Sequence, residues 1–76
     1  MSQIHPKTLE ILIKIGSNVL KYRYEKNLTQ EDLAFLCDTD RSFICKIETC
    51  KFEGITIGTL AKLSTALEVD IRDLME

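Results

Sequence analysis

Long apolar runs are absent from this 76-residue chain. None approaches the roughly 18 residues that a membrane-spanning helix needs, so we expect no membrane span. The first residues, Met1–Pro6, have neither a basic flank leading into an apolar block nor a small-residue cleavage site, which predicts no export signal and a cytoplasmic location. Low-complexity tracts, internal repeats and Gly/Ser linkers are also absent, and the length predicts a single domain over residues 1–76.

Residues that hold metals or perform catalysis are few. One His and three cysteines without a C-x-x-C spacing do not complete a usual zinc set. The chain has no Gly-rich phosphate loop and no evident pair of nucleophile and base, so we expect no metal, cofactor, enzymatic activity or small-molecule effector. Cys37, Cys45 and Cys50 cannot all pair within one chain. Free thiols in a reducing compartment are therefore expected, with a redox switch at Cys45 as the alternative.

A strong excess of positive charge is also missing. The net charge is −2, which argues against indiscriminate nucleic-acid binding. The distribution is uneven: residues 1–51 contain eight Lys/Arg against seven Asp/Glu, and residues 52–76 contain two against five. Because DNA binding needs a local basic face and not a basic protein, the first two thirds of the chain are the better place for such a face.

Helix signals are dense along the whole chain. Pro6 suits the first position of a helix, and Asn27 is a plausible stop. Between them, residues at steps of three and four form one stripe, which consists of Leu9, Leu12, Gly16, Val19, Leu20 and Arg23. The spacing predicts one long helix that begins at Pro6.

Four further helices are predicted from capping residues, which are Thr29 with Asp32, Asp40, Thr56, and Asp70 with Asp73. Their expected core positions are, in chain order, Leu33, Leu36 and Cys37; Ile44 and Ile47; Ile57, Leu60, Leu63 and Leu67 with Ala61 and Ala66; and Ile71, Leu74 and Met75. No segment shows the sustained alternation of a strand. The pattern predicts an all-α, five-helix orthogonal bundle.

The second and third of these helices have the features of a helix-turn-helix. Two helices joined by a short turn can place the second one in the major groove of DNA. The small Ala34 permits close packing, and Asp38 tolerates the unusual backbone angles of the turn. Ile44 and Ile47 lie one turn apart and are expected to face inward. Their orientation leaves an outer face with Arg41, Ser42, Cys45, Lys46 and Thr49.

Several separated motifs of the chain resemble one known family. They are LTQEDLA at 28–34, DRSFI at 40–44, KIE at 46–48, TLAKL at 59–63 and ALEV at 66–69. These motifs are similar, in order and spacing, to those of the phage-repressor-like (Cro/C1, xenobiotic-response-element) helix-turn-helix family, and within it to the controller proteins of restriction-modification systems. The resemblance covers about residues 15–75, and residues 1–14 extend the first helix. It implies a lambda-repressor-like DNA-binding domain.

The resemblance also implies roles for individual residues. Gln30 matches a position that bonds a DNA phosphate. Arg41, Ser42 and Lys46 match positions that reach base edges or phosphate, and Arg41 is the best candidate for bidentate recognition of guanine. Phe43 matches a residue beside the DNA backbone, where its ring can contact a sugar or a thymine methyl. Cys45, Thr49 and Lys51 complete the expected DNA-binding set, and Thr49 and Lys51 flank, with Thr56, a loop along phosphate.

Other positions of the family pattern are structural. Arg23 and Glu48 match a partly buried ion pair between the first and third helices. Tyr22 and Tyr24 flank Arg23; we expect one to be partly buried and the other exposed, without a function for either. Three departures from the family pattern stand out: Asp38 replaces a Gly in the turn, Thr39 replaces an aliphatic residue, and Cys50 replaces a Gly or Asn after the third helix.

A chain this short buries a marginal core, so a second copy often supplies extra burial. In the family the C-terminal helices commonly form the two-fold contact. The residues expected there are Leu67, Val69, Ile71, Leu74 and Met75. A second apolar patch, Ile4, Ile11 and Ile15 on the first helix, is the alternative. A two-fold homodimer would match palindromic DNA.

The resulting hypothesis is a transcriptional repressor or controller that binds double-stranded operator DNA as a homodimer. The alternative is a protein-interaction module, such as an antitoxin or coactivator-like bundle, in which the apolar patch binds a different protein. Salt-sensitive binding to a palindromic duplex would distinguish the two, because phosphate contacts make affinity depend on salt.

Overall fold

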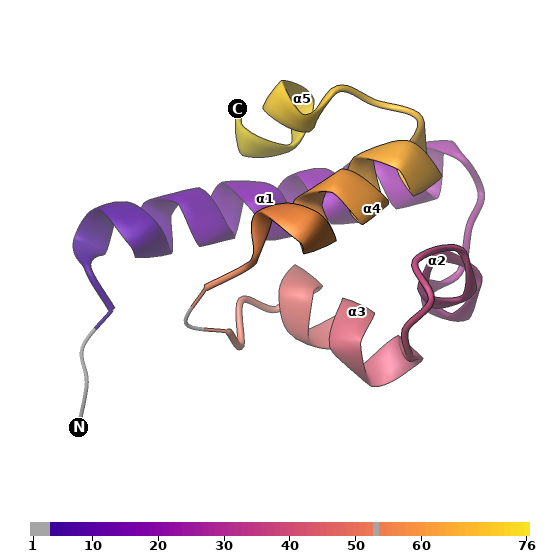
Figure 1. Ribbon diagram of the computed structural model, residues 1–76, viewed down its shortest axis with the longest axis horizontal. Coiled ribbons are helices and arrows are strands. Elements are labelled where there is room, and N and C mark those ends of the chain that lie inside the picture. The colour runs from indigo at the N-terminus through magenta and orange to yellow at the C-terminus, as the bar shows by residue number, and fades with distance from the viewer. Residues whose placement is uncertain (1–3, 53) are drawn as a thin grey trace.

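The computed structural model describes residues 4–52 and 54–76, and this part of the chain is all-helical (Figure 1). Its helices are α1 (Pro6–Glu25), α2 (Gln30–Leu36), α3 (Arg41–Glu48), α4 (Ile57–Leu67) and α5 (Ile71–Met75). The prediction of an all-α chain with five helices is therefore confirmed. In Figure 1, α1 runs along the length of the molecule, with α5 on one side of it and α2 and α3 on the other.

Each helix begins at a side chain that accepts a hydrogen bond from the backbone of its first turn. Thr29 and Asp32 form the predicted reciprocal capping box at α2, and Asp70 and Asp73 form the second one at α5. Asp40 and Thr56 cap α3 and α4. The backbone N–H of Thr29 donates to the carboxylate of Asp32, which lowers the pKa of that carboxyl group. These caps set the boundaries that the sequence predicted.

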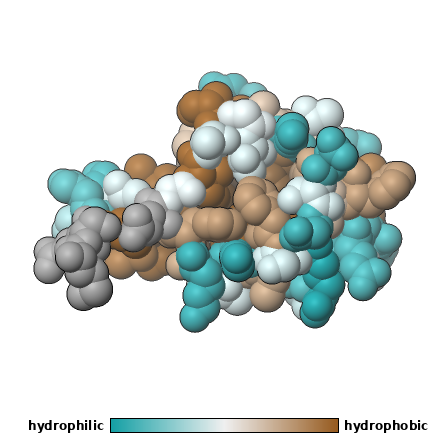
Figure 2. Space-filling view, turned by 60° about the horizontal axis from the view of Figure 1, so that its bottom comes forward, coloured by the Kyte–Doolittle hydropathy of each residue, from teal (hydrophilic) through white to brown (hydrophobic). Residues whose placement is uncertain are grey.

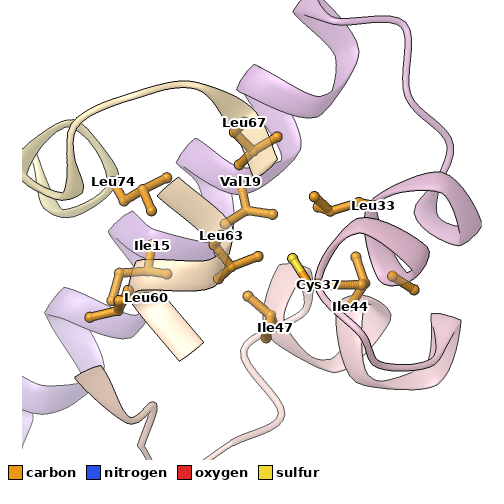
Figure 3. Packing of buried hydrophobic residues seen from close by; sticks show 11 residues of the cluster. Ile15, Val19, Leu33, Cys37, Ile44, Ile47, Leu60, Leu63, Leu67 and Leu74 are labelled. Atoms are coloured by element: carbon orange, nitrogen blue, oxygen red, sulfur yellow. The ribbon is translucent and has the colours of Figure 1, made fainter. Parts of the chain in front are cut away.

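The core lies where α1, α2, α3 and α4 meet, with α5 closing one side (Figure 3). Its largest fully buried side chains are Val19, Leu33, Ile44, Ile47, Leu63, Leu67 and Leu74. Burying one such aliphatic side chain contributes about 1.5–3 kcal/mol. Ile44 and Ile47 are 0% and 2% exposed, so α3 packs through the face that the sequence predicted.

Four residues expected in the core are instead on the surface: Leu9, Leu36, Ile57 and Ala61. Leu9 lies in the first turns of α1, which extend past the other helices (Figure 1). Leu36 is the last residue of the short helix α2. Leu33 and the cap residue Cys37, four residues apart, share the side of α2 that faces the core, and Leu36 points away from it. Ile57 is the first residue of α4, before Leu60 begins the buried stripe. Ala61 follows the buried Leu60 by one residue, which turns its side chain about 100° away from the core.

Two of the family departures lie in the left-handed backbone region. Asp38, in the turn between α2 and α3, has φ 57°, and Cys50, just after α3, has φ 58°. An Asp tolerates this region through local hydrogen bonding, as expected. At Cys50 the thiol lies 3.6 Å from the carbonyl oxygen of Leu12, so its side chain packs against α1. The chain thus leaves α3 in the conformation that Gly or Asn would favour.

Gly16 allows α1 to approach the end of α3 closely. A Cβ atom at this position would lie 2.6 Å from the carbonyl oxygen of Ile47 and 3.3 Å from the thiol of Cys50. The first of these atoms is backbone and cannot move without shifting α3. The absence of a side chain at Gly16 therefore sets the distance between α1 and the helix-turn-helix.

Replacing Gly16 by Ala is expected to destabilise the protein by about 1–3 kcal/mol, because the added methyl group forces α1 and α3 apart. Gly58→Ala is the matched control, since a Cβ there would meet no atom closer than 3.8 Å. The control is expected to be neutral or to stabilise by about 0.5–1 kcal/mol. Urea unfolding followed by circular dichroism measures both, and equal stability of the two variants would contradict the close-approach explanation.

Candidate nucleic-acid interface

The outer face of α3 presents polar side chains to solvent. Arg41, Ser42 and Lys46 are exposed, and Cys45 is half-buried. In Figure 2, hydrophilic side chains lie over the part of the molecule where α2 and α3 lie in Figure 1, with hydrophobic surface among them. The described helices of the same chain leave this face uncovered. An exposed α-helix with this side-chain set fits the width of a DNA major groove.

A buried ion pair fixes α3 against α1. Arg23 Nε donates to Glu48 at 2.7 Å and Arg23 Nη2 donates to the other carboxylate oxygen at 3.0 Å, with side chains that are 7% and 5% exposed. The hydrogen bond to Glu48 raises the pKa of Arg23. Arg23 Nη1 also donates to the carbonyl oxygen of Leu28. The ion pair expected between Arg23 and Glu48 is present, and it is bidentate.

Gln30 joins this network at the start of α2. Its side-chain amide donates to Glu48 Oε1 at 3.0 Å, so one carboxylate receives bonds from both α1 and α2. Glu48 is the last residue of α3. Hydrogen bonds to one carboxylate therefore join α1, α2 and α3.

The remaining residues expected to contact DNA differ in how much of each side chain is exposed. Phe43 is half-buried and its ring packs against Phe52, with 5.1 Å between ring centroids, so only part of it can reach a partner. The hydroxyl of Thr49 donates to the carbonyl oxygen of Cys45 at 2.8 Å. Lys51 is exposed just after α3. Thr49 and Lys51 thus lie directly after α3.

An open groove runs between the end of α1 and the starts of α2 and α3. Its walls include Tyr24, Asn27, Gln30 and Arg41. Tyr24 is 65% exposed and its ring lies 4.8 Å from the Arg23 guanidinium carbon, whereas Tyr22 is half-buried, as the sequence led us to expect. Sequence reasoning missed the position of Tyr24 and Asn27 beside Arg41, because the groove forms only when three helices meet.

Of the three cysteines, Cys37 is buried and Cys45 and Cys50 are half-buried. Burial raises the pKa of the Cys37 thiol, which disfavours the reactive thiolate. All three cysteines are free thiols. In residues 4–52 and 54–76, no group of three His, Cys, Asp or Glu side chains is placed to hold a metal ion.

Two residues of the expected dimer patch belong to the core of the chain itself. Leu67 and Leu74 are both 0% exposed and pack with Val19 and Leu63, so they are not available to a second copy (Figure 3). The prediction is wrong for these two residues, because the apolar stripe of a short helix is consumed by its own bundle. Val69, Ile71 and Met75 are half-buried and keep some surface. In the alternative patch, Ile15 is buried as well, at 2% exposure.

Fold and site together define a helix-turn-helix DNA-binding protein: a small helical bundle that presents the polar face of its third helix. Residues 18–76 match the family model of the Cro/C1-type HTH DNA-binding domain. The chain belongs to this family of DNA-binding domains. The predicted family is confirmed.

Individual relatives include controller proteins of restriction-modification systems. The chain is 36% identical over 70 residues to control protein C.BamHI from Bacillus amyloliquefaciens, which covers 91% of this chain and 85% of the relative. The crystal structure of the controller C.AhdI from Aeromonas hydrophila is 36% identical, covers 83% of this chain and 94% of its own, and superimposes with a TM-score of 0.77. The biofilm regulator SinR, solved in complex with DNA, is 29% identical, covers 82% and 98%, and also has a TM-score of 0.77.

None of the described helices is both long enough and apolar enough to cross a membrane.

Proposed function

We propose that this chain is a cytoplasmic transcriptional controller of the restriction-modification type that binds a palindromic operator as a homodimer. The observation that carries the proposal is the exposed outer face of α3 on a bundle of this family. Support comes from C.BamHI and C.AhdI, which are control proteins, and from SinR, which binds DNA in its solved complex.

In the proposed complex, α3 enters the major groove. Arg41 and Ser42 lie at its first turn and read base edges, with Arg41 donating two hydrogen bonds to a guanine. Lys46, one turn on, contacts a base or a phosphate. Phe43 offers the free edge of its ring to a sugar or a thymine methyl group.

Phosphate contacts hold the helix in place on either side. Gln30 reaches phosphate with the part of its amide that Glu48 does not engage. Thr49 and Lys51, directly after α3, lie along the DNA backbone. Cys45 is half-buried and borders the same DNA-contacting face of α3. Residues 57–76, which contain four acidic residues against two basic ones, stay away from the DNA, and the surface left on Val69, Ile71 and Met75 contributes to the two-fold contact.

Selection from a library of random duplexes tests this function. The enriched sequences are expected to form a palindrome whose half-sites are about 34–36 Å apart, one turn of DNA. The affinity for the selected duplex is expected to fall with salt, with a slope of about −0.9 in log–log terms for each phosphate contacted. Enrichment of no sequence, or of a single asymmetric site, would contradict the proposed dimeric controller.

A further inference from the structure

The first turns of α1 are apolar over more of their circumference than the core covers. Leu12 and Ile15 face inward and are 5% and 2% exposed, whereas Leu9, Ile11 and Ile13 are 42%, 36% and 49% exposed. This segment, Pro6–Lys14, is called the arm, and it projects past the other helices (Figure 1). Figure 2 shows hydrophobic surface along the same projecting part. The match to the family model begins at residue 18, after this segment.

One side of the arm borders an apolar groove. The groove is lined by Thr8, Ile11 and Ile15 of α1, Ile55 of the loop before α4, Leu60 of α4 and Met75 of α5. Ile13 lies on the other side of the arm, since two residues along a helix turn its side chain by about 200°. Met75, which belongs to the proposed two-fold contact, lines the groove from α5.

The face of α1 that contains Ile11 has two lysines and contacts the end of α5. Lys7, Ile11, Lys14 and Asn18 follow one another at steps of four and three, so they share one face of α1. The amide of Asn18 donates to the carbonyl oxygens of Leu74 and Glu76, which places the end of α5 beside this face.

The two sides of the groove differ in net charge. The arm has Lys7 and Lys14 against Glu10, whereas residues 70–76 have three acidic residues against Arg72. Lys7 and Lys14 lie 3.7 Å and 3.6 Å from the same carboxylate, that of Glu10, in exposed pairs. Exposed pairs of this kind hold a lysine weakly, so both remain available to a second acidic partner.

We propose that two copies of this chain associate through this groove, with their arms antiparallel and crossing at Ile11. In such a crossing, Lys7 lies opposite residue 15 of the partner, close to where Glu76 of the partner subunit lies. The two-fold axis repeats the same pair on the other side, so the groove is complementary to a copy of itself. The inference rests on the proposed homodimer and adds the arm as its main contact.

Sedimentation equilibrium without DNA tests the contact. Ile11→Gln is expected to raise the dimer Kd about tenfold or more, since both copies lose an apolar contact. Ile13→Gln, the same change on the other side of the arm, is the matched control and is expected to leave the Kd unchanged. Lys7→Glu and Glu76→Lys are each expected to raise the Kd about threefold to tenfold, and the double variant is expected to restore it. Circular dichroism checks that every variant folds.

Three results would overturn the proposal. If the native chain is a dimer and neither Ile11→Gln nor the charge reversals change its Kd, the two-fold contact lies elsewhere and the proposed dimeric controller stands. If Ile13→Gln is the variant that weakens the dimer, the contact is on the other side of the arm. If the native chain stays a monomer of 8.7 kDa at about 100 μM, far above the concentrations at which specific operator complexes form, both the arm contact and the homodimer fail. Binding to a single half-site, measured separately, would then still show whether α3 recognises DNA.

Discussion

Glu48→Ala is expected to destabilise the protein by about 3–5 kcal/mol, because it leaves the Arg23 guanidinium buried without its charge partner. The carboxylate accepts hydrogen bonds from Arg23 and Gln30, and the ion pair is 7% and 5% exposed. A chain of this length is stable by only about 4–11 kcal/mol in total. The variant is therefore expected to lose a large fraction of its stability and to unfold at lower temperature and lower urea concentration, which circular dichroism measures.

Glu10→Ala is the control for this variant. Glu10 also faces two cationic partners, Lys7 and Lys14, but it is 53% exposed, and its removal is expected to change stability by less than about 0.5 kcal/mol. A third variant, Arg23→Met with Glu48→Leu, removes both charges and is expected to recover much of the loss. If Glu48→Ala and Glu10→Ala are equally stable, the network does not hold α3 in place.

Arg41→Ala is expected to reduce discrimination among DNA sequences by about 5- to 150-fold, since a bidentate contact to guanine contributes about 1–3 kcal/mol of discrimination. Arg41 is exposed at the first position of α3, so its loss is expected to leave the unfolding curve unchanged. Competition between the selected duplex and a scrambled duplex, read by fluorescence anisotropy, measures the ratio.

The matched control is Arg72→Ala. Arg72 is the other strongly exposed arginine, with a side chain 81% exposed, and it lies on α5 beside Asp70. Its removal is expected to leave discrimination unchanged. If Arg41→Ala destabilises the protein, or if both variants bind the selected duplex as the native chain does, the outer face of α3 does not read DNA in the way proposed.

Local patterns in the sequence predicted most of the fold. Capping residues such as Thr29 and Asp70 act within one helical turn, so their effect is visible in the sequence and all five helices begin where predicted. The inward orientation of Ile44 and Ile47 follows from their spacing. The Arg23–Glu48 pair, 25 residues apart in the chain, was predicted from the family resemblance alone, because nothing local links the two residues.

The errors occurred where packing between distant segments decides. Spacing places Leu67 and Leu74 on the apolar faces of their helices, but it does not tell whether the chain's own core or a second copy covers those faces. In the fold, the chain's own core buries both residues. Leu9 keeps the helical spacing of the core stripe and yet lies past the end of the bundle. Similarly, spacing offers no sign that the amide of Gln30 bonds to Glu48, which is 18 residues away. The DNA-contact roles themselves remain predictions until the variants above are measured.

The attachment of α3 through its final residue separates two tasks along one short helix. Glu48 holds the end of α3 in place by accepting hydrogen bonds from Arg23 and Gln30. Arg41, Ser42 and Lys46 are exposed on the outer face of α3 and make none of these bonds. Substitutions at these three exposed positions are therefore expected to change the free energy of unfolding little. If these positions read bases as proposed, operator specificity changes by point mutation alone, and the same three positions are the ones to randomise when redirecting the protein to a chosen DNA sequence.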